Sequence, residues 1–176
     1  MKLSETRYID DRSLPQKLFL IYWRILWILL KRVLPLRVGF LWRICLVKVH
    51  GGVIGWNSRI YGSVKIYDPR NLSIGDFVTV GPHVNLYSVQ KIVIGNGTVV
   101  SQKSELLTAS HDFKSDSFDL VKKSITIGDD VWLSQGVWVG PGVKIANKTT
   151  VGARGLVVKS ILVSGVYVAP TVDRLG

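Results

Sequence analysis

The fold of this chain is decided by residues 127–157, IGDDVWLSQGVWVGPGVKIANKTTVGARGLV. Every sixth residue of this stretch is a branched aliphatic, and the residue after it is usually small or turn-forming. The aliphatic positions are Ile127, Leu133, Val139, Ile145, Val151 and Val157. Because an α-helix repeats every 3.6 residues and a β-strand every two, a period of six fits neither. It predicts an all-β, triangular solenoid with three short faces per coil.

The same six-residue frame recurs upstream, with shifts of two residues after Ile66 and after Leu86. Its aliphatic anchors there are Ile54, Ile60, Ile66, Ile74, Val80, Leu86, Ile94, Val100 and Leu106. Three hexads make one coil, so the frame predicts about five coils. These coils are 54–71, 74–91, 94–111, 127–144 and 145–162. Stacking them buries a continuous aliphatic column, at roughly 25 cal/mol per Å² of apolar area.

One long segment interrupts the frame. Residues 112–126 read DFKSDSFDLVKKSIT, and His111 stands immediately before them. Binding and catalytic residues gather on loops that a rigid scaffold positions. We therefore expect this extruded, polar segment to line a functional site.

The first 49 residues form a separate unit in this interpretation, a basic helical arm ahead of a β-solenoid domain at 50–176. Residues 18–34, LFLIYWRILWILLKRVL, are followed by Pro35, which predicts the end of a helix. Lys17, Arg24 and Lys31 are spaced by seven and form one stripe on an otherwise mostly apolar helix. This pattern favours residues 17–49 lying on an anionic membrane surface.

Two other interpretations of the arm stay open. In the first, the arm packs against the rest of the protein or against a sister subunit. In the second, the arm spans a membrane or serves as a signal anchor. A span is disfavoured because the uninterrupted apolar runs in 18–34 are six residues long, whereas a spanning helix needs roughly 20. A span would also place Arg24 near the bilayer centre, where a charge is costly. We expect a cytoplasmic protein held at the inner face of the membrane.

The charge balance is basic but uneven. The net charge is +11, and residues 1–48 supply +7 of it through ten Lys or Arg against three Asp or Glu. Nucleic-acid sites place cations on polar surfaces, whereas here the cations interrupt an apolar helix, so no nucleic-acid partner is expected. A lone Cys45 excludes a disulfide framework and a cysteine-rich metal finger.

Several motifs resemble a known family. The repeats IGDDVWL, VGPGVKI and VGAR resemble the left-handed β-helix hexapeptide acyltransferases. Residues 80–113, which end in the triplet Ser110-His111-Asp112 and Phe113, are similar to the branch of colanic-acid and capsular-polysaccharide O-acetyltransferases. The resemblance covers about residues 50–170. It implies a left-handed parallel β-helix, a homotrimer with active sites between subunits, acetyl-CoA as co-substrate and a carbohydrate hydroxyl as acceptor.

His111 is the candidate catalytic residue, because the family's catalytic histidine occupies this position of the triplet. Acetyl transfer to a hydroxyl requires removal of the alcohol proton, and neutral imidazole is suited to that role near pH 7. No covalent nucleophile is needed if both substrates bind together. The plainer alternative is a corner histidine that hydrogen-bonds backbone.

Two neighbouring positions are candidate substrate-binding residues. Asn85 matches a family asparagine on the coil before the histidine, where it would hydrogen-bond the acceptor. Asp112 would orient the imidazole or shape the loop. The alternative for Asn85 is a purely structural role as a corner asparagine of a coil.

The resemblance also implies a coenzyme site on the later coils. The candidate coenzyme-binding residues are Gln135, Ala153, Arg154, Val158 and Lys159. Lys159 and Arg154 would pair with CoA phosphates; the alternative for each of the five is an exposed corner. The family usually continues with V-x-A-G-N-P-A, but residues 168–176 read VAPTVDRLG. The missing Gly-Asn pair is expected to weaken the donor contacts.

The remaining histidines predict no metal site. His50 precedes Gly51-Gly52 and is expected to be structural, and His83 lies in a turn and is expected to be solvated. A zinc site of the γ-carbonic-anhydrase type needs two ligands close in sequence, but the three histidines are 33 and 28 residues apart.

The leading hypothesis is therefore an acetyl-CoA-dependent O-acetyltransferase acting on a sugar or a lipid-linked glycan. N-acetylation of an amino sugar is an alternative enzymatic activity. The non-enzymatic alternative is a trimeric scaffold at the membrane, and the altered C-terminus is its best support.

Overall fold

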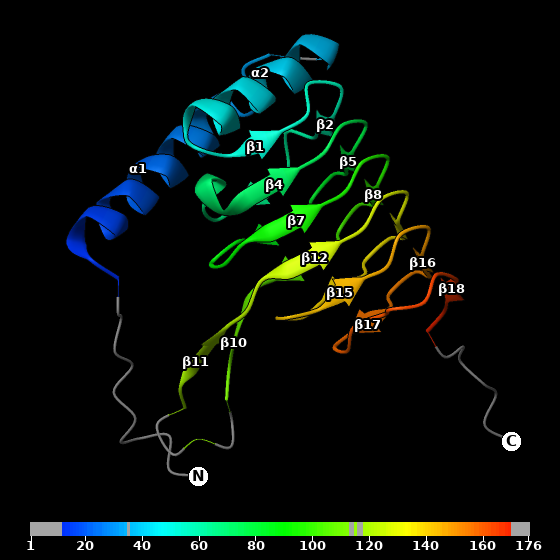
Figure 1. Ribbon diagram of the computed structural model, residues 1–176. Helices are drawn as coiled ribbons and strands as arrows, with labels where there is room; N and C mark the ends of the chain where they lie inside the picture. The colour runs from blue at the N-terminus through cyan, green and yellow to red at the C-terminus, as the bar shows by residue number, and fades with distance from the viewer. Residues whose placement is uncertain (1–11, 35, 113–114, 116–117, 170–176) are drawn as a thin grey trace, which may run out of the picture.

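A computed structural model describes residues 12–34, 36–112, 115 and 118–169 (Figure 1). Two helices, α1 (Leu14–Leu30) and α2 (Leu36–Val49), precede a prism of parallel strands with three faces. Face A holds β1 (Val53–Ile54), β4 (Leu72–Ile74), β7 (Ile92–Ile94), β12 (Ile125–Ile127) and β15 (Lys144–Ile145). Face B holds β2 (Arg59–Ile60), β5 (Thr79–Val80), β8 (Val99–Val100), β13 (Trp132–Leu133), β16 (Thr150–Val151) and β18 (Val166–Tyr167). Face C holds β3 (Lys65–Ile66), β6 (Asn85–Tyr87), β9 (Glu105–Leu107), β14 (Trp138–Val139) and β17 (Leu156–Val157).

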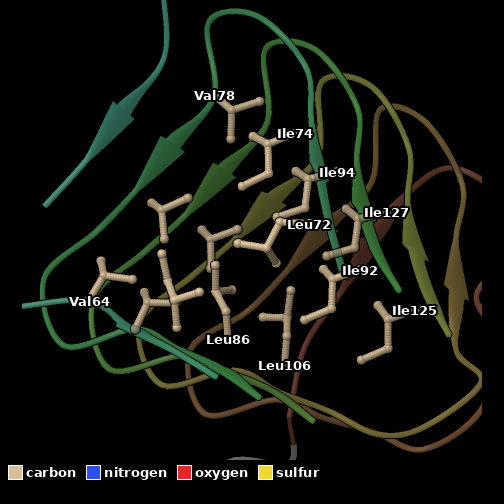
Figure 2. Close-up of a cluster of buried hydrophobic side chains, with 14 of the residues drawn as sticks. Val64, Leu72, Ile74, Val78, Leu86, Ile92, Ile94, Leu106, Ile125 and Ile127 are labelled. Carbon is tan, nitrogen blue, oxygen red and sulfur yellow. The ribbon is translucent and has the colours of Figure 1, made fainter. Parts of the chain in front are cut away.

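The anchors of the six-residue frame form the core, as predicted. All fifteen are buried and stack in register as three columns, one behind each face. The column behind face A, for example, runs Ile54, Ile74, Ile94, Ile127 and Ile145. Figure 2 shows such side chains meeting inside the prism. The predicted left-handed parallel β-helix is thus confirmed.

The coil count differs from the prediction. The structure has about six turns rather than five, because β18 adds a further strand to face B next to β16. This strand escapes the sequence pattern because Val166 and Tyr167 are both exposed and carry no inward anchor. The first two coils are two residues longer than the last ones. The short 3₁₀ helix η2 (Pro69–Asn71) takes up the first of these shifts.

Close packing between neighbouring coils explains why a small residue follows the anchor at a corner. At Gly128, an added Cβ would lie 2.2 Å from Oδ1 of Asn147 on the next coil. That same oxygen accepts a hydrogen bond from the backbone N–H of Asp129 at 2.9 Å. The close approach that links two coils therefore requires a residue without a side chain.

The helical arm packs on the first coil of the prism (Figure 1). Trp23 and Trp27 are buried, and their indole N–H groups donate to the carbonyls of Ile66 (3.1 Å) and Val64 (2.9 Å). Arg43 of α2 is also buried and donates to the Ile60 carbonyl. α1 ends at Leu30, ahead of the predicted end at residue 34, and α2 begins at Leu36, whereas Pro35 lies outside the described residues. Residues 1–11 of the expected arm lie outside the described residues.

The opposite side of the arm remains apolar and exposed. Its exposed apolar side chains are Leu14, Leu18, Ile21, Tyr22, Ile25, Ile28 and Leu29 from α1, with Val38 and Leu41 from α2. Among the described residues, neither helix combines the length and apolar character needed to cross a bilayer.

The expected extruded segment is organised as a hairpin. β10 (Ala109–His111) pairs antiparallel with β11 (Leu120–Lys122) and projects from the prism (Figure 1). The excursion therefore begins before residue 112, and Ile125 and Thr126 already belong to face A. The hairpin carries His111 away from the regular coil on a paired strand.

Candidate active site

His111 is held at the end of β10 by a backbone carbonyl. Its Nδ1 lies 2.8 Å from the carbonyl oxygen of Phe118, and its ring stacks on the Phe118 ring with centroids 4.4 Å apart and planes 7° from parallel. The hairpin fixes this arrangement, because the Asp112 N–H donates to the Asp119 carbonyl at 2.9 Å.

The Phe118 contact selects one tautomer of the imidazole. A carbonyl oxygen only accepts hydrogen bonds, so Nδ1 must carry the proton in this contact. In the neutral ring, the basic lone pair is then on Nε2. This geometry suits a base that takes a proton from an alcohol through Nε2.

Asn85 lies on β6, between Lys65 of β3 and Glu105 of β9 in the strand register of face C. Tyr67, directly after β3, and Tyr87 at the end of β6 meet edge to face with ring centroids 4.8 Å apart. The half-buried Asn85 side chain lines a groove of about 670 Å³ between α1 and face C. The groove therefore contains a hydrogen-bonding amide, that of Asn85, beside the aromatic rings of Tyr67 and Tyr87.

The five candidate coenzyme residues lie along two borders of face C. Gln135 is at the corner between faces B and C, where its carbonyl accepts from the Arg154 N–H at 2.8 Å, and Ala153 precedes Arg154 at this corner. Val158 and Lys159 follow β17 at the corner between faces C and A. All five are exposed.

The hairpin with His111 and the Val158-Lys159 pair share one corner of the prism. The hairpin leaves the prism after β9, and β17 is two strands further along face C. Two strand spacings of about 4.8 Å therefore separate the base of the hairpin from the Val158-Lys159 pair by roughly 10 Å along the prism axis. An extended ligand at this corner therefore reaches from Lys159 towards the hairpin.

The other histidines behave as expected. His50 is held by the Leu46 carbonyl at Nδ1 (2.7 Å) and by the Tyr22 hydroxyl at Nε2 (3.0 Å), which is a structural role. His83 is exposed at a corner with φ of 59°. Within the part of the chain that the structure describes, no three His, Cys, Asp or Glu side chains gather as a metal site would require.

Sequence reasoning missed Phe118. Asp112 was expected to orient the imidazole or to shape the loop, and the structure also places the Phe118 carbonyl against Nδ1. A backbone carbonyl has no side-chain signature, and its position depends on the hairpin, which the six-residue frame does not encode.

Comparison with known proteins shows the family of this chain. No protein-family model matches the chain. It is 46% identical over 125 residues, 71% of this chain and 69% of the relative, to the putative colanic acid biosynthesis acetyltransferase WcaF of Escherichia coli K12. The chain belongs to the hexapeptide-repeat acetyltransferases. The resemblance drawn from residues 80–113 is therefore confirmed.

Solved structures of hexapeptide-repeat acetyltransferases share the fold over most of the chain. A maltose O-acetyltransferase of Clostridium difficile 630 superposes with a TM-score of 0.78 at 23% identity, covering 92% of this chain and 87% of its own. A hexapeptide-repeat acetyltransferase of Vibrio cholerae complexed with acetyl coenzyme A gives 0.79 at 19% identity, covering 93% and 89%. These likenesses show the fold, and the 46% identity to the WcaF relative shows that the chain is an acetyltransferase.

Proposed function

We propose that this acetyltransferase transfers the acetyl group of acetyl-CoA to a hydroxyl of a sugar, with His111 as general base. The observation that carries the proposal is the Nδ1 contact of His111 with the Phe118 carbonyl at 2.8 Å. It places the basic lone pair of the neutral ring on Nε2. The WcaF relative and the sugar acetyltransferases of the same fold support a carbohydrate acceptor.

The reaction proceeds by direct transfer. The sugar oxygen attacks the thioester carbonyl while Nε2 takes the hydroxyl proton, which forms a tetrahedral intermediate. The C–S bond then breaks, and the imidazolium returns its proton to the departing thiolate. The products are an acetyl ester and CoA thiol. The Phe118 carbonyl holds the ring and stabilises its protonated form.

The donor is proposed to lie along the corner shared by Lys159 and the hairpin. Lys159 at this corner supplies positive charge for the CoA phosphates, and Val158 presents exposed surface for the pantetheine arm. Gln135, Ala153 and Arg154 lie at the other border of face C, where they would contact the donor of a neighbouring subunit. The roughly 10 Å along this corner, from the Val158-Lys159 pair to the base of the hairpin, suits an extended arm that carries its thioester towards His111.

We propose that the chain forms a homotrimer in which a neighbouring prism covers this donor site. Leu156, Val158 and Trp132 are exposed large hydrophobic residues on or beside faces B and C of the later coils. Burial of these side chains against a neighbouring subunit would remove their apolar surface from water.

We further propose that the protein acts at the inner face of the cytoplasmic membrane. The exposed apolar side of α1 has the composition of a helix that lies in the headgroup layer. In this proposal, residues 1–49 are the membrane-facing unit and residues 50–176 the catalytic unit, although Trp23 and Trp27 join them.

The test is product analysis with the full-length protein. Acetyl-CoA is incubated with a panel of mono- and oligosaccharides, and free thiol is measured beside mass-spectrometric detection of acetylated sugar. We expect one thiol released per acetyl group, and an ester that hydroxylamine cleaves. Formation of a hydroxylamine-stable amide on an amino sugar, or no acetylated sugar across the panel, would overturn the O-acetylation proposal.

A further inference from the structure

The groove between α1 and face C is strongly cationic. Five basic side chains and no acidic ones are found among the described residues that line it. The basic residues are Arg12, Lys17, Arg24, Lys31 and Lys65. Arg24 lies on α1, Lys31 follows the last residue of that helix as its C-cap, and Lys65 faces them from β3. Like charges gathered in a concave site raise the local positive potential and attract anions.

The cations come close enough to influence one another. Burial lowers the pKa of Lys31 from its ordinary value, and the nearby charges of Arg32 and Lys65 lower it further. The Lys31 ammonium donates to the Val64 carbonyl at 3.3 Å, so it is held at the groove floor by a neutral group. A bound anion would relieve the repulsion between Lys31 and Lys65.

The same groove contains features suited to a sugar. Asn85 presents an amide that both donates and accepts hydrogen bonds. Tyr67 and Tyr87, which meet edge to face, also line the groove. Aromatic faces and amides are suited to the mixed apolar and polar surface of a sugar ring. The cations and the sugar-binding features therefore belong to one cavity.

The groove also opens onto the apolar side of α1. Ile21 and Ile28 line it and are 58% and 59% exposed, so they belong at once to the groove and to the outer apolar surface. A ligand with phosphates in the groove is thereby offered an apolar exit.

We propose that this groove binds an acceptor whose sugar is joined to a diphosphate, with Arg24, Lys31 and Lys65 on the phosphates and Asn85, Tyr67 and Tyr87 on the sugar. The inference rests on the proposed sugar O-acetylation and names its substrate class. The diphosphate belongs to a polyprenyl diphosphate-linked sugar or to a nucleoside diphosphate sugar, which share this chemistry.

The first test measures the groove without catalysis. Inorganic pyrophosphate is titrated calorimetrically into the full-length protein, Arg24→Gln, Lys65→Gln and the double variant, with exposed Lys144→Gln on β15 as the matched control. We expect the Kd to rise at least tenfold in the double variant and to stay unchanged in Lys144→Gln, because charge-assisted phosphate contacts are lost. Equal Kd values in all proteins would overturn the proposal.

The second test measures the substrate class. The KM is compared for one sugar free, as its uridine diphosphate conjugate and as its farnesyl diphosphate conjugate. We expect a lower KM for a diphosphate conjugate and at least a tenfold rise of that KM alone in the double variant. The conjugate with the lower KM identifies the source of the diphosphate.

The two proposals fail differently. Acetylation of free and conjugated sugar with equal KM values, unaffected by Arg24 and Lys65, would overturn the diphosphate site and leave sugar O-acetylation standing. Pyrophosphate binding that depends on Arg24 and Lys65, together with no acetylation of any sugar, would retain the anion site and overturn the proposed function.

Discussion

Truncation of one core anchor tests the stacked-column account of stability. Leu133 is fully buried on β13, in register with Val100 of β8 and Val151 of β16. Leu133→Ala removes three carbons, worth about 2.4 kcal/mol of transfer free energy at ~0.8 kcal/mol each. The cavity left between two flanking coils adds to this, so we expect a total loss of about 3–5 kcal/mol in the free energy of unfolding.

The assay is urea unfolding followed by circular dichroism at one fixed protein concentration, because association shifts apparent stability. With an m-value of roughly 3 kcal/mol per M, the midpoint should fall by at least about 1 M. Leu162→Ala is the matched control, since Leu162 is 73% exposed and its truncation should cost less than about 0.5 kcal/mol. Equal midpoint shifts in the two variants would refute the reasoning.

Three further substitutions test other contacts. Trp27→Phe should lower the free energy of unfolding by about 1 kcal/mol, because the indole bond to the Val64 carbonyl is lost while Lys31 still donates to that oxygen; an unchanged urea midpoint would contradict this. Lys159→Gln should raise the KM for acetyl-CoA about fivefold, equivalent to ~1 kcal/mol for an exposed charge pair, and a KM equal to wild type would argue against the placement of the phosphates. Ile25→Ser, at a side chain 55% exposed on the outer face of α1, should weaken sedimentation with anionic liposomes, whereas undiminished sedimentation would count against the membrane proposal.

The regular part of the fold was predictable because each coil repeats the same packing problem. An anchor such as Val139 must point inward in every coil, so its position is written in the sequence with a period of six. The partial turn made by β18 was missed, because Val166 and Tyr167 pair through backbone alone and remain exposed. Backbone pairing without burial leaves no hydrophobic pattern to detect.

The arm was only partly predictable. Its apolar helix follows from local composition, but α1 ends at Leu30 rather than at the predicted residue 34. Which side packs on the prism is decided by Trp23 and Trp27, whose indoles reach carbonyls of residues about 40 positions away. Such long-range pairing is a property of the folded chain. It also means that deletion of residues 1–36 would uncover the first coil, so single outer-face substitutions are the better test of membrane binding.

The candidate site shows the same division. His111 and Asn85 became candidates through the family resemblance of a triplet and of a coil position, whereas the Phe118 carbonyl that selects the imidazole tautomer depends on how the hairpin closes. The cationic groove was also missed as a site. Lys65 lies on an ordinary coil face, and it meets Arg24 and Lys31 only because α1 packs across face C.

The most direct test of the catalytic role of His111 is the kcat of His111→Asn at saturating acetyl-CoA, with acetyl-CoA binding measured separately by calorimetry. The control is His83→Asn, the same substitution at an exposed corner whose φ of 59° asparagine tolerates. The account predicts a fall in kcat of about 10²–10⁴-fold for His111→Asn, an unchanged Kd for acetyl-CoA, and an unchanged kcat for His83→Asn. A His111→Asn protein with wild-type kcat would contradict it.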